Sequence, residues 1–140
     1  MTTSIDTNVI VALWADDAEL SLAAEEALES AFRRGSLVVA APVFAELIAA
    51  PGRTEAFVGS LLEENGIVID WNLNEAVWRA AGRAFQGYAE RRRQQHDQGT
   101  RRILADFLIG AHAQVRGYRL LSLDERLYRA AFPTLKIETV

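Results

Sequence analysis

Three things are scarce in this chain of 140 residues: cysteine, lysine and long apolar runs. The absence of cysteine excludes disulfides, a thiolate nucleophile and thiolate metal sites, and it fits a reducing compartment. No apolar run approaches the roughly 18 residues that cross a bilayer, and the polar opening MTTSIDTN has no signal-peptide character. We therefore expect a cytoplasmic protein that does not use a membrane.

Lys136 is the only lysine among the 15 basic residues, and the formal net charge is −4. The molecule as a whole therefore does not attract nucleic acid, so such a contact would need a local basic surface or a metal. The arginine bias suits bidentate contacts with phosphate or carboxylate, although GC-rich coding explains it equally well. Length and composition predict a single domain over residues 1–140.

Short apolar runs alternate with helical patterns along the chain. The runs predict strands at Thr3–Asp6, Ser36–Ala41, Ile67–Asp70, Tyr118–Ser122 and Leu135–Thr139. Helices are predicted at Asn8–Ala15, Ala18–Arg34, Pro42–Ala50, Arg53–Glu64 (with Phe57, Leu61 and Leu62 inward) and Asn74–Arg91, with a short one around Tyr128. This alternation predicts an α/β protein: a three-layer α/β/α sandwich around a parallel sheet of four or five strands.

The most apolar predicted helix, ILADFLIGAHA from Ile103 to Ala113, contains one carboxylate, Asp106. Its apolar stripe comprises Leu104, Leu108, Ala111 and Val115. An acid at the edge of such a surface is costly to desolvate unless a cation or hydrogen-bond donors compensate it. We therefore expect Asp106 to face a compensating group in the folded protein.

Other acids fall at the ends of the predicted strands. Asp6 ends the first strand, Glu46 lies one turn into the helix after the second, and Asp124 follows the fourth. Ligands of parallel sheets bind at the carboxyl ends of the strands, so we expect these acids to meet Asp106, with Asn8 beside them. Without a paired arginine or lysine they would repel one another. Mg²⁺ or Mn²⁺ would remove that cost and could activate water for phosphodiester cleavage.

Each acid also has a separate explanation. Asp6 and Asn8 are acceptable helix N-caps, and Ser122 with Glu125 fits a capping box that leaves Asp124 as a first-turn acid. Glu46 and Asp106 would each interact favourably with a helix dipole. These explanations do not account for acids at all four strand ends, so the metal site is preferred.

The segments SIDTNVI, APVFAEL, ILADFLIGAHA and LLSLDERLYRAAFP resemble, in order and spacing, the successive motifs of the PIN domain family, in particular those of VapC-type toxins. The resemblance implies an acidic quartet of Asp6, Glu46, Asp106 and Asp124, supported by Asn8 and Ser122. It further implies a Mg²⁺- or Mn²⁺-dependent endoribonuclease for single-stranded or loop RNA, which forms a homodimer and is inhibited by a cognate antitoxin. In that mechanism, Asp6, Asp106 and Asp124 hold the principal metal, and Glu46 binds through water or to a second ion.

The remaining polar and apolar features are less specific. The segment 91–102 predicts a polar loop or a frayed helix end, and its Arg91, Arg92, Arg93, Arg101 and Arg102 could hold RNA phosphates or form a solvated face. His96 and His112 offer a metal-free acid/base route, although packing or solvent exposure is their default. We assign an apolar excess on the early helices to the dimer and antitoxin surfaces: Trp14, Phe44, Leu47, Phe57 and Leu61.

Two other functions compete with the nuclease. A phosphorylatable receiver domain would use Asp6, Asp70, Ser122 and Lys136, but it needs an adjacent acid pair on the first strand, and Lys136 falls inside a predicted strand. A catalytically silent PIN-like interaction domain would keep the fold without cleavage.

Overall fold

The computed structural model describes residues 1–95 and 102–140, and these form a sheet of five parallel strands. The strands are β1 (Thr2–Ile5), β2 (Ser36–Ala40), β3 (Ile67–Asp70), β4 (Arg119–Ser122) and β5 (Ile137–Thr139). Their order in the sheet is β3-β2-β1-β4-β5, with β5 at an edge as expected. The predicted parallel α/β architecture is confirmed.

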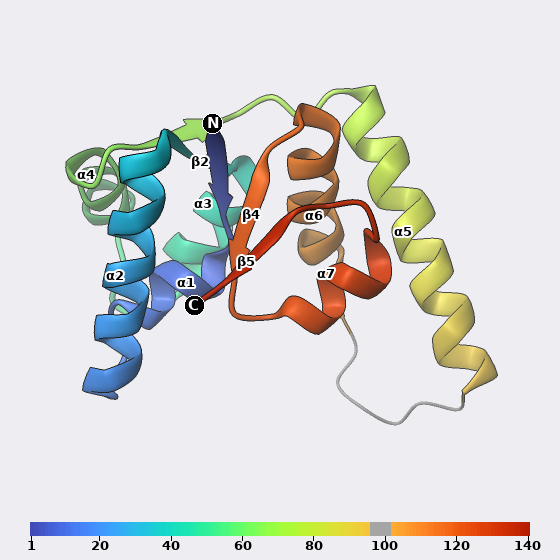
Figure 1. Ribbon diagram of the computed structural model, residues 1–140, viewed down its shortest axis with the longest axis horizontal. Helices are drawn as coiled ribbons and strands as arrows, with labels where there is room; N and C mark the ends of the chain where they lie inside the picture. Colours follow the sequence, from blue (N-terminus) through green and yellow to red (C-terminus); the bar gives the residue numbers. More distant parts are fainter. Residues whose placement is uncertain (96–101) are drawn as a thin grey trace.

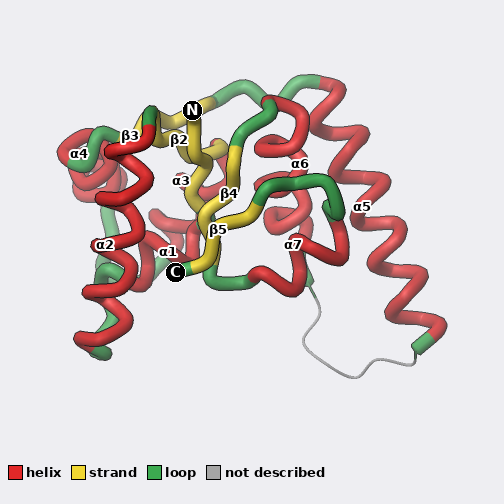
Figure 2. The backbone as a smooth tube through the Cα atoms, viewed as in Figure 1, coloured by secondary structure: helices red, strands yellow, loops and turns green. Residues whose placement is uncertain are grey.

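Helices cover both faces of the sheet. They are α1 (Thr7–Ala12), α2 (Ala18–Arg34), α3 (Ala41–Ala49), α4 (Glu55–Glu64), α5 (Glu75–Gln94), α6 (Leu104–Arg116) and α7 (Glu125–Ala131). In Figures 1 and 2 the strands lie between α2 and α4 on one side and α5 and α6 on the other. Across the described part of the chain, no helix has the length and apolar character needed to cross a bilayer.

The path of the chain creates a switch point in the sheet. From β1 the strands are added outward through β2 to β3, and the chain then returns to place β4 on the other side of β1. Neighbouring connections therefore diverge between the carboxyl ends of β1 and β4, where sheets of this type form their ligand crevice. Asp6 follows β1 and Ser122 ends β4, so both stand at this point.

Helix α6 is buried more completely than its stripe predicted. Every residue from Phe107 to Ala113 is buried, because α6 packs against β2 and β4 on one side and α5 on the other. The ring of Phe107 stacks on Phe85 of α5 at 4.7 Å between centroids. The prediction that the whole stripe faces the core was wrong at its two ends, since Leu104 and Val115 are 41% and 38% exposed.

Other sequence predictions also need correction. Helix α5 continues to Gln94, so for Arg91, Arg92 and Arg93 the helix-end alternative is correct and the loop alternative is wrong. Residues 96–101 lie outside the described residues. Phe57 is 45% exposed and lies beside Trp14, while the inward positions of α4 are Val58 and Leu62. Leu47 is fully buried and cannot belong to a binding surface.

Helix α6 packs so closely against Phe132, the C-cap residue of α7, that position 110 has no room for a side chain. A Cβ on Gly110 would lie 2.3 Å from the ring of Phe132, which is itself buried. We expect Gly110→Ala to lower the free energy of unfolding by about 1–3 kcal/mol, measured by urea titration. Gly82→Ala, on the open side of α5, should instead raise it by about 0.5–1 kcal/mol. Equal effects of the two changes would contradict the close packing.

Candidate functional site

Asp6 is held in the interior at the end of β1. Its N–H donates to the Leu121 carbonyl of β4 at 2.9 Å, and its side chain is almost completely buried. The Ser122 hydroxyl donates to Asp6 Oδ2 at 2.7 Å. Asp6 stands at the N-cap position of α1, but its side chain makes no capping hydrogen bond, so the simple capping explanation fails for this residue.

Asn8 and Ser122 connect the two strand ends around Asp6. Asn8 Oδ1 accepts from the N–H of Leu123 at 3.1 Å, and its Nδ2 approaches Ser122 Oγ at 3.4 Å. Ser122 Oγ also accepts from the N–H of Asp124 at 2.9 Å. The residues chosen from the sequence as supporting groups therefore contact one another across the gap between β1 and β4.

Glu46 and Asp106 enter the same region from two other elements. Thr7, which sequence reasoning missed, donates its hydroxyl to Glu46 Oε1 at 2.6 Å. A hydroxyl directly after Asp6 was the available signal. Asp106 lies in the first turn of α6 and is partly buried. Its pKa is raised by burial first, then by the charge of Glu46 and to a lesser extent by Asp124.

The interior position of Asp6 has a direct electrostatic consequence. Burial raises the pKa of the Asp6 carboxyl to about 6; the hydrogen bond from Ser122 opposes this rise, and the charge of Asp106 adds to it. The fully buried Tyr128 of α7 lies beside these acids. Burial and then the charges of Asp6 and Asp106 raise the pKa of its hydroxyl. Sequence reasoning had treated Tyr128 only as an apolar position.

Asp124 differs from the sequence prediction in two ways. It is itself the N-cap of α7, with Oδ1 accepting from the N–H of Leu127 at 3.3 Å, so Ser122 is not the cap. Its other oxygen, Oδ2, lies 2.7 Å from Nη1 of Arg102. The expectation that all four acids lack a paired arginine was therefore wrong for Asp124.

The acids fit a divalent cation in chemistry and in charge. All are oxygen donors, and burial together with mutual repulsion disfavours the ionised forms of Asp6 and Asp106, which a hard cation would relieve. As the side chains stand, no three acidic or histidine groups in residues 1–95 and 102–140 converge closely enough to hold a metal. Binding would thus require side-chain adjustment within the group.

The PIN domain profile matches residues 4–133. The chain belongs to the PIN domain family. Among solved structures, VapBC-1 from nontypeable Haemophilus influenzae is 16% identical with a TM-score of 0.68, over 99% of this chain and 98% of that one. A toxin–antitoxin complex from Klebsiella pneumoniae is 17% identical with a TM-score of 0.65, over 95% and 94% of the two chains.

VapBC2 from Rickettsia felis, solved bound to a promoter DNA fragment, is 16% identical to this PIN domain with a TM-score of 0.63, over 100% of this chain and 99% of that one. At these identities the likeness shows a shared fold. No curated protein sequence matches the chain significantly.

The receiver alternative is excluded by family and by geometry. Receiver modules have the strand order 2-1-3-4-5, which differs from the order observed here. Asp70 is not free for phosphorylation, because Oδ2 lies 2.8 Å from Nε2 of His112 and 3.5 Å from Arg116. These partners hold the pKa of Asp70 below its usual range against the opposing effect of burial. Lys136 precedes β5 and is exposed, not inside a strand.

His112 is fully buried in this PIN domain and is committed to Asp70, so the prediction that it packs in the interior holds and a surface position is wrong. His96 lies outside the described residues. A histidine route to RNA cleavage therefore receives no support from the geometry of His112.

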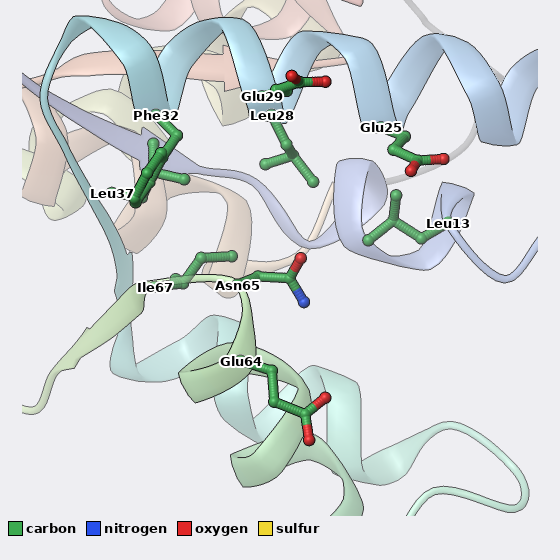
Figure 3. Close-up of a pocket in the computed structure, with 9 residues that line it drawn as sticks. All are labelled: Leu13, Glu25, Leu28, Glu29, Phe32, Leu37, Glu64, Asn65 and Ile67. Atoms are coloured by element: carbon green, nitrogen blue, oxygen red, sulfur yellow. The ribbon is translucent and has the colours of Figure 1, made fainter.

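Two recesses are relevant to binding, and only the first lies next to the acids. It has about 360 Å³ and lies between α5, α7 and the residue Arg102 that precedes α6; four arginines line it: Arg91, Arg92, Arg102 and Arg126. Sequence reasoning missed Arg126; Arg93 does not line the recess, and Arg101 lies outside the described residues. The other, of about 340 Å³, lies between α2 and the α4–β3 turn (Figure 3), where Glu25, Glu29 and Glu64 surround an apolar floor.

The pKa of Asp6 predicts a pH dependence of stability. Because the folded-state pKa is about 6 and the ordinary value 3.8, the folded protein retains a proton that the unfolded chain has lost between these values. The resulting stabilisation is complete below 3.8 and is lost as the pH rises through about 6. In EDTA, Asp6→Asn should therefore gain on the order of 2–3 kcal/mol over wild type as the pH is raised across this range, measured by urea unfolding.

The matched control is Asp16→Asn, because Asp16 is exposed and lies outside the acidic group. Its unfolding free energy should follow the wild-type pH profile. If both variants gave the same profile, the buried carboxyl of Asp6 would not be its source.

Proposed function

We propose that this PIN domain is a metal-dependent endoribonuclease that cleaves single-stranded or loop RNA as the toxin of a toxin–antitoxin pair. The proposal is supported by the electrostatic influence of the acids on one another: Asp106 raises the pKa of Asp6, and Glu46 and Asp124 raise that of Asp106. Asp6 lies at the switch point between β1 and β4. A metal-dependent nuclease uses such a group of acids, whereas a silent interaction domain gains nothing from their electrostatic cost.

In the proposed mechanism, Asp6, Asp106 and Asp124 hold the principal Mg²⁺ or Mn²⁺, and Glu46 serves through water or a second ion. When bound, the ion activates water and offsets charge on the phosphate oxygens. The chain itself keeps the carboxylates in place: Ser122 fixes one oxygen of Asp6, and Thr7 fixes one oxygen of Glu46. Asn8 supports Ser122 by tying the loop after β4 to α1.

The RNA backbone would be held by arginines beside the acids. Arg91, Arg92 and Arg102 line one recess with Arg126, and their guanidinium groups suit bidentate contacts with phosphate. Arg93 and Arg101, close in sequence, complete the basic segment in this proposal. A local basic surface is needed because the net charge of the protein is −4.

Charge-neutral substitutions test the acids. We expect Asp6→Asn and Asp106→Asn each to lower Mg²⁺- or Mn²⁺-dependent RNA cleavage at least about 100-fold, since each removes a metal ligand while keeping side-chain size. The measurement is cleavage of total RNA, with sequencing of the new ends to identify the target, alongside growth after induced expression. Full activity in both variants would overturn the four-acid mechanism.

Asp16→Asn again serves as the control, because it removes the same charge from an exposed position and should leave cleavage unchanged. His112→Gln separates the metal-free route, since it should not alter the pH profile of cleavage if His112 only packs against Asp70. An inactive wild-type protein with every metal tried would favour the silent interaction domain.

A protein partner is supported by the structures that share this fold, because several are toxin–antitoxin complexes. We propose that a cognate antitoxin binds this chain, and that its apolar and basic side chains occupy the recess of Figure 3, where glutamates surround an apolar floor. We further propose a homodimer, since large apolar side chains such as Trp71 and Trp78 are 62% and 49% exposed. We propose a cytoplasmic location, where the protein would meet its antitoxin, a second copy of itself and its RNA substrate.

Light scattering after size-exclusion chromatography tests both assemblies. Alone, the protein should give twice its monomer mass of 15.5 kDa. Where a neighbouring reading frame encodes a small DNA-binding protein, co-expression with that protein should give a heavier complex and abolish toxicity. A monomer alone would contradict the dimer, and unchanged mass and toxicity on co-expression would contradict the antitoxin.

A further inference from the structure

Arg102 is paired with the oxygen of Asp124 that does not cap α7. Asp124 Oδ1 caps α7 by accepting from Leu127, so Oδ2 is the outward oxygen, and it lies 2.7 Å from Nη1 of Arg102. The charge of Arg102 also acts on Asp106, where it lowers the carboxyl pKa against the larger effect of burial. Arg102 is therefore a cation already placed within the acidic group.

The backbone of Arg102 is fixed while its side chain remains accessible. Its N–H donates to the hydroxyl of Tyr88 on α5 at 2.8 Å. Tyr88 packs against Phe107 at 5.4 Å between ring centroids, so the anchor belongs to the α5–α6 contact. The Arg102 side chain is 38% exposed. The guanidinium can therefore change partner without any change in the helices.

The same guanidinium borders the arginine recess. Arg91, Arg92 and Arg126 line this recess with Arg102, at the edge of α7 directly after Asp124. Several guanidinium groups around one hollow match an anion with more than one oxygen, such as a backbone phosphate. Arg102 thus has two possible anionic partners: the carboxylate of Asp124 and an RNA phosphate in the recess.

We propose that Arg102 is a positioning residue that exchanges between these partners. Without a divalent cation it neutralises Asp124. Asp124 would help to hold a divalent cation, and Arg102 would then leave this carboxylate and turn to the RNA phosphate. The inference rests on the proposed nuclease function. Because two cations beside the same carboxylate repel each other, Arg102 opposes metal binding in the absence of RNA, and metal and RNA increase each other's affinity.

Titration with Mn²⁺ alone tests the competition without any cleavage. By isothermal calorimetry we expect Arg102→Gln to bind Mn²⁺ about three- to fivefold more tightly than wild type, because a partly exposed competing ion pair is lost. Arg102→Lys, which keeps the charge, should remain close to wild type. Arg126→Gln is the matched control: it removes an arginine from the recess that does not contact Asp124, and its Mn²⁺ affinity should not change.

The second readout is the binding of a single-stranded RNA oligonucleotide in Ca²⁺, with a gel to verify that it stays intact. Adding Ca²⁺ should raise the RNA affinity of wild type more than that of Arg102→Gln. Arg102→Gln and Arg126→Gln should both bind RNA roughly fivefold more weakly in Ca²⁺. Unfolding curves in EDTA verify that each variant is folded. If Arg102→Gln does not fold, Arg102→Lys replaces it in the comparison.

Unchanged or weaker Mn²⁺ binding by Arg102→Gln would overturn the exchange, as would equal gains in RNA affinity from Ca²⁺ in both proteins. The proposed nuclease fails separately, if wild type binds Mn²⁺ with the expected Arg102 effect but cleaves no RNA.

Discussion

One electrostatic constraint governs the site: carboxylates are buried at the switch point between β1 and β4, where their ionised forms are unfavourable. Asp6 is almost completely buried between β1 and β4, and its pKa rises to about 6 as a result. Asp106 has its pKa raised by burial and by the charge of Glu46. A purely structural protein would gain stability by replacing these acids. This electrostatic cost is the physical reason for proposing a divalent cation at the acids.

Hydrogen bonds from neighbouring elements make this cost tolerable and give the acids fixed positions. The hydroxyl of Ser122 on β4 donates to Asp6 after β1, and the hydroxyl of Thr7 on α1 donates to Glu46 on α3. A backbone N–H in the first turn of α7 donates to Asp124. Each donor fixes one oxygen of its carboxylate, which restricts side-chain rotation. Arg102 supplies the one positive charge that the described residues pair with the four acids, and it connects them to the arginine recess.

Helix α6 is the element that joins stability to the site. Its middle is buried on every side, between the sheet and the aromatic contacts with α5, and its first turn directly precedes this buried part. Asp106 lies in that turn and Arg102 lies just before it, so the packing of α6 positions both residues. His112 and Asp70 fasten the other end of α6 to the end of β3. The acidic site thus adjoins a helix whose middle is completely buried.

The sequence alone determined the element order, the parallel sheet and the elements in or beside which Asp6, Glu46, Asp106 and Asp124 lie, because periodicity and chain breaks are local signals. It did not determine which partners these acids meet, since contacts between distant segments depend on packing. The pair of Arg102 with Asp124, the hydroxyl of Thr7 on Glu46 and the buried Tyr128 beside Asp6 all belong to that second class. The exposed Phe57 and the buried Leu47 show the same limit for apolar residues. A helix pattern shows which residues share a face, but only tertiary structure decides what covers that face.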